Sequence, residues 1–183
     1  MRLKFYLKEH NISIYQLSKN ADIPYPNVYN LVNGKADIKK CTYGHIKKIA
    51  NALSLSMEEL DLLCDKGFSF QVFRSEQKHQ MHRKGELDYV IDVLQNKEID
   101  RFWRLSMYAE ALYLLASVDH LCKKNDLPLC LEYAQYRNCQ LDRPVYSLDT
   151  EIEYRILHDT SAYDRSDKDS IQEYKRYNII EGV

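Results

Sequence analysis

The residues best suited to chemistry near the start of this 183-residue chain are cationic. The first 50 residues hold nine lysines and arginines against three acidic residues, which is a local charge of +6, and because the whole chain carries −1 the remainder carries −7. Such asymmetry between the ends of a chain indicates nucleic-acid binding at the basic end. An ordinary solvated face would give a similar excess, so charge leaves both interpretations open.

Cysteine and histidine side chains could instead bind zinc. The five cysteines are scattered and include no Cys-x-x-Cys pair: Cys41, Cys64, Cys122, Cys130 and Cys139. Structural zinc sites usually pair their ligands closely, which disfavours the one candidate set, His120 with Cys122, Cys130 and Cys139. The sequence favours reduced thiols in or near a core, and predicts neither a metal nor a cofactor.

Catalytic motifs are absent from the sequence. It contains no Gly-x-Gly-x-x-Gly, no Walker-type loop, no Gly-x-Ser-x-Gly and no His-Glu-x-x-His, and it has five glycines with which to shape a backbone cradle. We therefore expect that the protein is not an enzyme.

The elements that must position the basic residues are helical. Nothing in the first 63 residues alternates with period two, whereas apolar residues recur three or four apart. Ser13 with Gln16 forms a capping-box pattern, Ser56 caps a last short helix, and Gly34 supplies a left-handed C-cap after Asn33. We expect a compact all-α bundle of five helices. Its apolar stripes are Leu3, Tyr6 and Leu7; Leu17; Val28 and Leu31; Tyr43, Ile46, Ile49, Ala50 and Leu53; and Met57, Leu60 and Leu63.

Residues 11–35 have the spacing of a helix-turn-helix: a helix of about eight residues, a tight turn near Asp22 and a second short helix that ends at Asn33-Gly34. Without a gap, this stretch resembles the Cro/C1-type (XRE) family of lambda repressor-like DNA-binding domains. Residues 45–60 look like the family's fourth and fifth helices, so the resemblance covers about residues 1–63. The matching positions are the buried Leu17, Ile23, Val28 and Leu31, the small Ser18 between the helices, and the terminating Asn33-Gly34-Lys35.

The resemblance implies that the helix around residues 24–33 lies in the major groove. It places base-reading side chains at Tyr25, Pro26, Asn27 and Asn30, and an asparagine amide can pair with N6 and N7 of adenine. Tyr25 and Tyr29 can touch thymine methyls or phosphates, although Tyr29 could equally pack on the surface.

The helix that precedes it begins with Ile14 and Tyr15, where the family often has a glutamine that contacts phosphate or base. The sequence departs from the family at Pro24, which replaces the usual Ser or Thr N-cap. Pro26 disfavours the α conformation at Tyr25, so we expect the second helix to begin at Pro26.

Phosphate contacts are expected from polar residues that follow this helix: Lys35, Lys39, Lys40, Tyr43 and His45. The last two open the next helix, whose N-terminal amides attract phosphate. Each lysine could also be an ordinary solvated residue.

We divide the chain into residues 1–65, the DNA-binding domain; 66–85, a junction with a short extended piece over 68–72; 86–146, a helical domain for dimerisation or partner binding; and 147–183, an acidic tail. A helical face is expected at Leu87, Val90, Ile91 and Leu94. Fifteen of the 21 residues in 102–122 are apolar, but charged residues interrupt them, so we expect a buried helix and no membrane span. Residues 149–183 hold nine acids and five bases, with room for a helix near 171–180.

One such domain buries little surface on DNA, whereas two held one helical turn apart roughly add their binding energies. We therefore expect a homodimer, with Trp103, Tyr108, Leu112 and Leu115 forming the dimer or partner interface. The alternative is that these four residues are simply the core of their own domain.

The function predicted from these features is that of a cytoplasmic, sequence-specific transcriptional regulator, a dimeric repressor that binds double-stranded DNA. No apolar signal-peptide segment opens the chain. The alternative is an antitoxin, which would repress its own operon and neutralise a co-encoded toxin through its C-terminal region. An acidic, tyrosine-rich tail able to fold onto a basic partner supports that alternative, but an ordinary solvated tail has the same composition.

Overall fold

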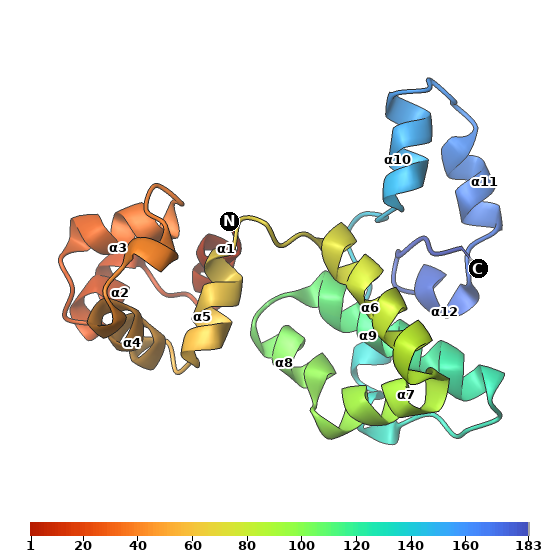
Figure 1. Ribbon diagram of the computed structural model, residues 1–183, viewed down its shortest axis with the longest axis horizontal. Helices are drawn as coiled ribbons and strands as arrows, with labels where there is room; N and C mark the ends of the chain where they lie inside the picture. Colours follow the sequence, from red (N-terminus) through yellow and green to blue (C-terminus); the bar gives the residue numbers. More distant parts are fainter. Residues whose placement is uncertain (183) are drawn as a thin grey trace. The chain divides into compact units, whose positions relative to one another are not determined.

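The computed structural model describes residues 1–182, and every regular element within them is a helix, with no strand. It divides into two compact units, the first ending at Ser69 and the second beginning at Phe70 (Figure 1). The predicted all-α class is confirmed. The two units are described separately below.

The first unit contains five α-helices and one 3-10 turn, which confirms the expected five-helix domain. They are α1 (Arg2–Glu9), α2 (Ile14–Asn20), α3 (Tyr25–Val32), η1 (Ile38–Lys40), α4 (Tyr43–Ala52) and α5 (Met57–Cys64).

The capping residues of this unit form the hydrogen bonds that the sequence predicts. Ser13 accepts from the backbone N–H of Gln16, whose side chain accepts in return from the Ser13 N–H, and Ser56 and Glu59 repeat the arrangement at α5. The apolar stripes then meet in a core in which Leu3, Val28 and Leu60 are fully buried. Caps and stripes together account for the bounds of these short helices.

Helix α3 begins at Tyr25, so the prediction that it begins at Pro26 is wrong by one residue. Pro26 occupies the second helical position, where an N–H needs no partner within the helix, and the proline therefore costs little. The other end follows the prediction. Gly34 has φ +69°, its N–H donates to Leu31 O, and the Lys35 N–H donates to Asn30 O at 2.8 Å. This Schellman motif stops the helix.

The second unit is built around α9 (Tyr108–Lys124), which is buried over almost all of its length. Helices α6, α7, α8 and α12 all contact it, so the helix is enclosed on several sides. The other elements of the unit are α6 (Phe70–Lys84), α7 (Glu86–Gln95), α8 (Glu98–Arg104), η2 (Leu131–Tyr133), η3 (Tyr136–Asn138), α10 (Leu148–Arg155), α11 (Ala162–Lys168) and α12 (Gln172–Lys175).

The extended piece expected over residues 68–72 is not observed, because α6 begins at Phe70. The aromatic residues there alternate in sequence, but helix α6 places Phe73 against Phe102 and Tyr113, with ring centroids 5.1 and 6.1 Å apart. Burial of this ring against α8 and α9 overrides the local strand-like pattern.

The buried face of α7 also differs from the expected one. Tyr89, Val90 and Val93 are buried, whereas Leu87 and Ile91 are 50% and 47% exposed. Both sets have helical spacing, and the position of α7 against α6 and α9 selects the stripe that contains the tyrosine.

The C-terminal residues pack into the second unit. Tyr174, Tyr177, Ile179 and Ile180 are at most 3% exposed, and a short helix, α12, replaces the longer one expected near residues 171–180. The sequence-based boundaries at 85/86 and 146/147 thus lie inside one compact unit.

Candidate nucleic-acid interface

Helix α3 divides its residues between core and solvent. Val28, Leu31 and Val32 are buried, whereas Pro26, Asn27 and Asn30 are exposed, as are Tyr25 and Tyr29 at 44% and 37%. The four residues expected to read bases, together with Tyr29, therefore lie on the solvent side of one short helix, whose orientation is fixed by its buried side.

The tyrosines of this helix contact each other and a lysine. The ring centroids of Tyr25 and Tyr29 are 5.9 Å apart, and the Lys35 ammonium lies 5.4 Å from the centre of the Tyr29 ring. On α2, the Lys19 ammonium lies 5.6 Å from the Tyr15 ring, which is 60% exposed. Cation–π contacts of this kind place positive charge beside aromatic surface that remains open to a ligand.

The turn between α2 and α3 is held by hydrogen bonds that fix the angle between the two helices. The Ser18 hydroxyl donates to Ile23 O at 2.7 Å. Asp22 adopts φ +49°, a left-handed conformation that aspartate tolerates. The Lys48 ammonium, from α4, donates to the Asp22 carboxylate at 2.8 Å and to its backbone carbonyl at 3.3 Å.

Lys48 is a positioning residue that sequence reasoning missed. Its hydrogen bond and its charge hold the pKa of Asp22 below its usual range. No local pattern could reveal this contact because the two residues are 26 positions apart and belong to different elements.

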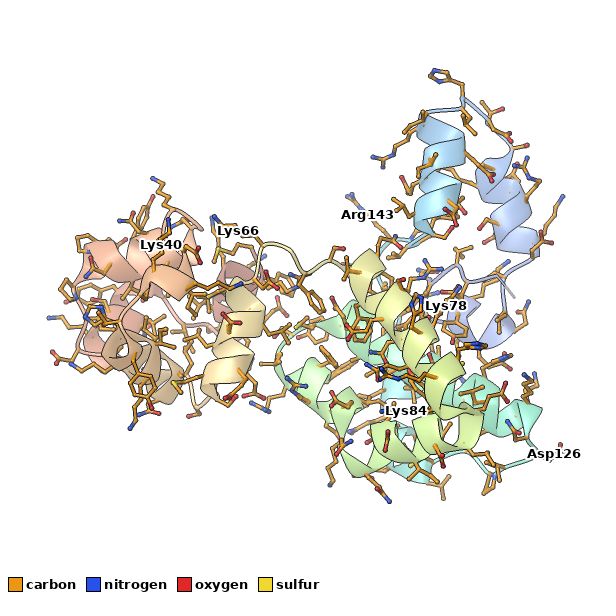
Figure 2. The ribbon with its side chains drawn as sticks, in the orientation of Figure 1. Lys40, Lys66, Lys78, Lys84, Asp126 and Arg143 are labelled. Carbon is orange, nitrogen blue, oxygen red and sulfur yellow. The ribbon has the colours of Figure 1, made fainter. Side chains whose placement is uncertain are left out.

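The expected phosphate-binding residues lie in the segment that connects α3 to the first turn of α4. Lys39 and Lys40 are exposed in η1, where the Asp37 side chain accepts from the Lys39 N–H at 3.0 Å (Figure 2 labels Lys40). At the start of α4, Thr42 accepts from the His45 N–H at 3.4 Å. Tyr43 is 64% exposed there, and His45 is half-buried. Because α2 contacts both α3 and α4, these elements form one packed scaffold.

The residues expected at a dimer or partner interface do not share one surface. Leu112 and Leu115 are 2% and 0% exposed in the core of the second unit, so that assignment is corrected for both of them. Trp103 and Tyr108 are half-buried; the Trp103 ring stacks on Tyr136 at 4.3 Å and meets Tyr108 edge-on at 5.0 Å. The helix that carries the leucines is enclosed by its own unit.

The five cysteines are free thiols, and no group of three or more metal-ligating side chains occurs within residues 1–182. Burial raises the pKa of the Cys64 thiol to about 12, with the nearby Asp61 adding to the effect. A thiol with so high a pKa is protonated at neutral pH and is a poor nucleophile.

Residues 2–61 match the family described as the Cro/C1-type HTH DNA-binding domain. The searches of the curated proteins and of the solved structures found no match.

Among the described residues, no helix has both the length and the apolar character needed to cross a membrane.

The family match spans α1 to α4 and most of α5, and its helix-turn-helix is α2, the Asp22 turn and α3. The residues that carry the resemblance in sequence also pack these helices together: Leu17, Ile23, Val28 and Leu31 are buried, and the Ser18 hydroxyl donates to Ile23 O. The N-terminal unit of this protein is a Cro/C1-type helix-turn-helix DNA-binding domain.

Proposed function

We propose that this protein is a sequence-specific, dimeric transcriptional repressor that reads the major groove with α3. The observation that carries the proposal is the division of α3, with Asn27 and Asn30 exposed on a helix whose other side is locked into the core of a domain of this family. A rigid helix with exposed amides is suited to direct readout of base edges.

The two amides are suited to this role by their spacing and freedom. Residues three apart are neighbours on a helix surface, so Asn27 and Asn30 can face consecutive base pairs. Neither side-chain amide is engaged by a hydrogen bond within the described chain. Each amide offers the donor and acceptor pair that matches adenine N6 and N7.

Phosphate contacts would then fix the register of α3. Lys35, Lys39 and Lys40 are exposed after the helix, and Tyr43 and His45 belong to the first turn of α4, whose backbone N–H groups favour an anion. Contacts of this kind orient the protein without selecting a sequence.

Repression and dimerisation complete the proposal, which involves no enzymatic activity. A dimer would place two α3 helices about 34 Å apart along the DNA and read an inverted repeat. The antitoxin alternative drew on a free acidic tail. Residues 170–181 pack into the second unit, so only residues 147–169 of the predicted tail remain to support an antitoxin. The regulator is therefore the stronger proposal.

The test is selection of bound fragments from sheared host genomic DNA at near-physiological salt. It compares the wild type with Asn27→Ala/Asn30→Ala and with the control Asn20→Ala/Asn51→Ala, which removes two exposed amides of the same unit outside α3. We expect an enriched inverted repeat in the wild type and the control, and loss of that enrichment in the α3 variant.

Equal enrichment by the α3 variant would contradict base reading by these asparagines. Enrichment of a single half-site by a protein that sediments as a monomer would contradict the dimer. A site upstream of the protein's own gene, with a second gene for a toxin in the same operon, would favour the antitoxin alternative.

A further inference from the structure

Helices α10 and α11 form a hairpin, residues 147–169, in which three apolar side chains carried by or next to α10 face the solvent. Figure 1 shows the two helices side by side. Leu148, Ile152 and Ile156 are 56%, 37% and 67% exposed. They are spaced four residues apart and therefore lie on one side of the helix. Leu148 and Ile152 belong to α10, and Ile156 is its C-cap residue. We name these three residues the α10 stripe.

The seam between the two helices is polar and aromatic. The Thr150 and Ser166 hydroxyls are 3.1 Å apart, and the Tyr163 ring lies 4.3 Å from those of both Tyr146 and Tyr154. Arg165 donates to Glu153 at 2.8 Å across the seam. The hairpin is therefore held closed by contacts that leave the α10 stripe unused.

The base of the hairpin is tied to the rest of the second unit. The Gln71 side chain donates to Tyr146 O at 2.7 Å, and the Val145 N–H donates to Asn178 O at 2.8 Å. Near the C-terminal end of α11, Asp167 pairs with Lys175 at 2.7 Å. The α10 stripe is thus presented on an anchored element, and clusters of exposed apolar residues on such elements mark interaction sites.

The charges around the α10 stripe restrict its partner. At about 3.6 residues per turn, Asp149 and Glu153 flank the stripe on one side and Glu151 with Arg155 on the other. The hairpin as a whole holds seven acidic and three basic residues. Arg155 pairs with Glu151 at 2.7 Å, and Arg165 pairs with Glu153 at 2.8 Å. The three flank carboxylates and these two arginines together therefore carry −1, and within the described residues Asp149 is the flank carboxylate that has no arginine beside it.

A second copy of this chain fits these charges poorly. Two α10 helices that pair antiparallel about Ile152 bring like flanks together, which places Asp149 and Glu153 of one copy against the same two carboxylates of the other. On the other flank Glu151 of one copy meets Arg155 of the other, so the flank of Asp149 and Glu153 is the one that sets like charges against each other and disfavours the pairing. A basic partner meets the same carboxylates with opposite charge.

We propose that the α10 stripe docks an amphipathic helix of a partner protein whose apolar face is flanked by lysine or arginine. Apolar contact with Leu148, Ile152 and Ile156 supplies affinity, and the acidic flanks select the charge of the partner. The proposal does not rest on the DNA-binding role of the first unit.

The test measures binding of two labelled helical peptides to the full chain by fluorescence anisotropy. Both carry one leucine face; one has lysine on its flanks and the other has glutamate. The protein is compared with Ile152→Asp/Ile156→Asp and with the matched control Leu87→Asp/Ile91→Asp, which changes a similarly exposed apolar pair on α7. Circular dichroism and the fluorescence of Trp103 verify that each variant is folded, and Ile152→Ser/Ile156→Ser replaces the aspartate variant if it is not.

We expect the lysine peptide to bind the wild type and the α7 control alike, and to bind the α10 variant at least tenfold more weakly. The glutamate peptide should bind the wild type at least tenfold more weakly than the lysine peptide. Equal loss in both variants, or equal binding of both peptides, would overturn the proposal. So would no measurable binding, or a wild-type dimer that the α10 variant alone abolishes, because the occupant would then be a second copy.

Discussion

The Lys48 ammonium donates to both the carboxylate and the backbone carbonyl of Asp22, and so links the turn between α2 and α3 to α4. Asp22 has a positive φ, and its carbonyl would otherwise rely on water. Lys48 thereby adds a link to α4 at a turn that the Ser18 hydroxyl also holds through its hydrogen bond to Ile23 O.

This link predicts the titration of Asp22. Because Lys48 lowers the pKa of the folded carboxyl below its ordinary 3.8, the contact stabilises the fold above that pH. The stabilisation is lost as the pH falls through the lowered folded-state pKa. In Lys48→Met, an NMR titration should return the Asp22 midpoint toward 3.8, and the stability difference from wild type should shrink in strong acid to the part that comes from the hydrogen bond to the Asp22 carbonyl. An unchanged midpoint would show that the ion pair does not form in solution.

The lysines of η1 predict the salt dependence of DNA binding. Lys39→Ala/Lys40→Ala should weaken binding to all sequences alike and reduce the slope of log affinity against log salt by about one for each phosphate that the variant no longer neutralises. Lys4→Ala/Lys8→Ala on α1 removes the same charge as a control and should leave the slope nearly unchanged. A reduced slope in both variants would indicate general electrostatic attraction instead of defined phosphate contacts.

Alanine should have opposite effects on the stability of the first unit at two glycines, Gly34 after α3 and Gly44 in α4. Gly34→Ala should destabilise the first unit by about 1–2 kcal/mol, because a Cβ is strained at φ +69°. That Cβ would also lie 3.1 Å from the Met1 sulfur. Gly44→Ala, in the first turn of α4 with nothing within 4 Å, should stabilise by about 0.5–1 kcal/mol. Hydrogen exchange of the α3 and α4 amides measures both, and a neutral Gly34→Ala would contradict the left-handed C-cap.

A buried ion pair predicts strong coupling in the second unit. Arg74 and Glu181 are 4% and 2% exposed and lie 2.5 Å apart, with Lys78 of α6 also 2.6 Å from Glu181 (Figure 2 labels Lys78). Arg74→Met should cost about 3 kcal/mol because it leaves a buried carboxylate with one exposed partner. Arg74→Met/Glu181→Met should cost much less than the sum of the single changes. Urea unfolding followed through Trp103 measures this, and additive costs would contradict the pairing.

Because Leu115 lies in the core of the second unit, shortening its side chain should lower the stability of that unit and leave the oligomeric state unchanged. Leu115→Ala should destabilise the second unit by about 2–5 kcal/mol, and this destabilisation should not depend on protein concentration. An interface residue would instead shift the oligomeric state in sedimentation experiments. A destabilisation that depends on protein concentration would indicate instead that Leu115 lies in a subunit interface.

Much of the first unit could be predicted from local chemistry. Ser13, Ser56 and Gly34 mark helix ends through hydrogen bonds that span three to five residues, and such signals are legible in sequence. The exposed positions of Asn27 and Asn30 followed from the same periodicity. The error at Tyr25 was one residue, because a proline in the first helical turn lacks only an N–H that the helix does not use.

The second unit shows why the rest could not be predicted. Two stripes of α7 have helical spacing, and contact with α6 and α9 decides that Val90 and Val93 are buried while Leu87 and Ile91 are not. The hairpin of α10 and α11 inverts the usual rule, since Thr150 lies inside it and Ile152 outside.

The sequence by itself therefore determined the helical class, the caps of the first unit and the side of α3 that faces solvent, because these depend on neighbours within a few residues. Tertiary structure decided the clamp of Lys48 on Asp22, the burial of Leu112 and Leu115 and the exposure of the α10 stripe. Those features depend on contacts between residues far apart in the chain, and such contacts stabilise the protein only after separate elements have packed together.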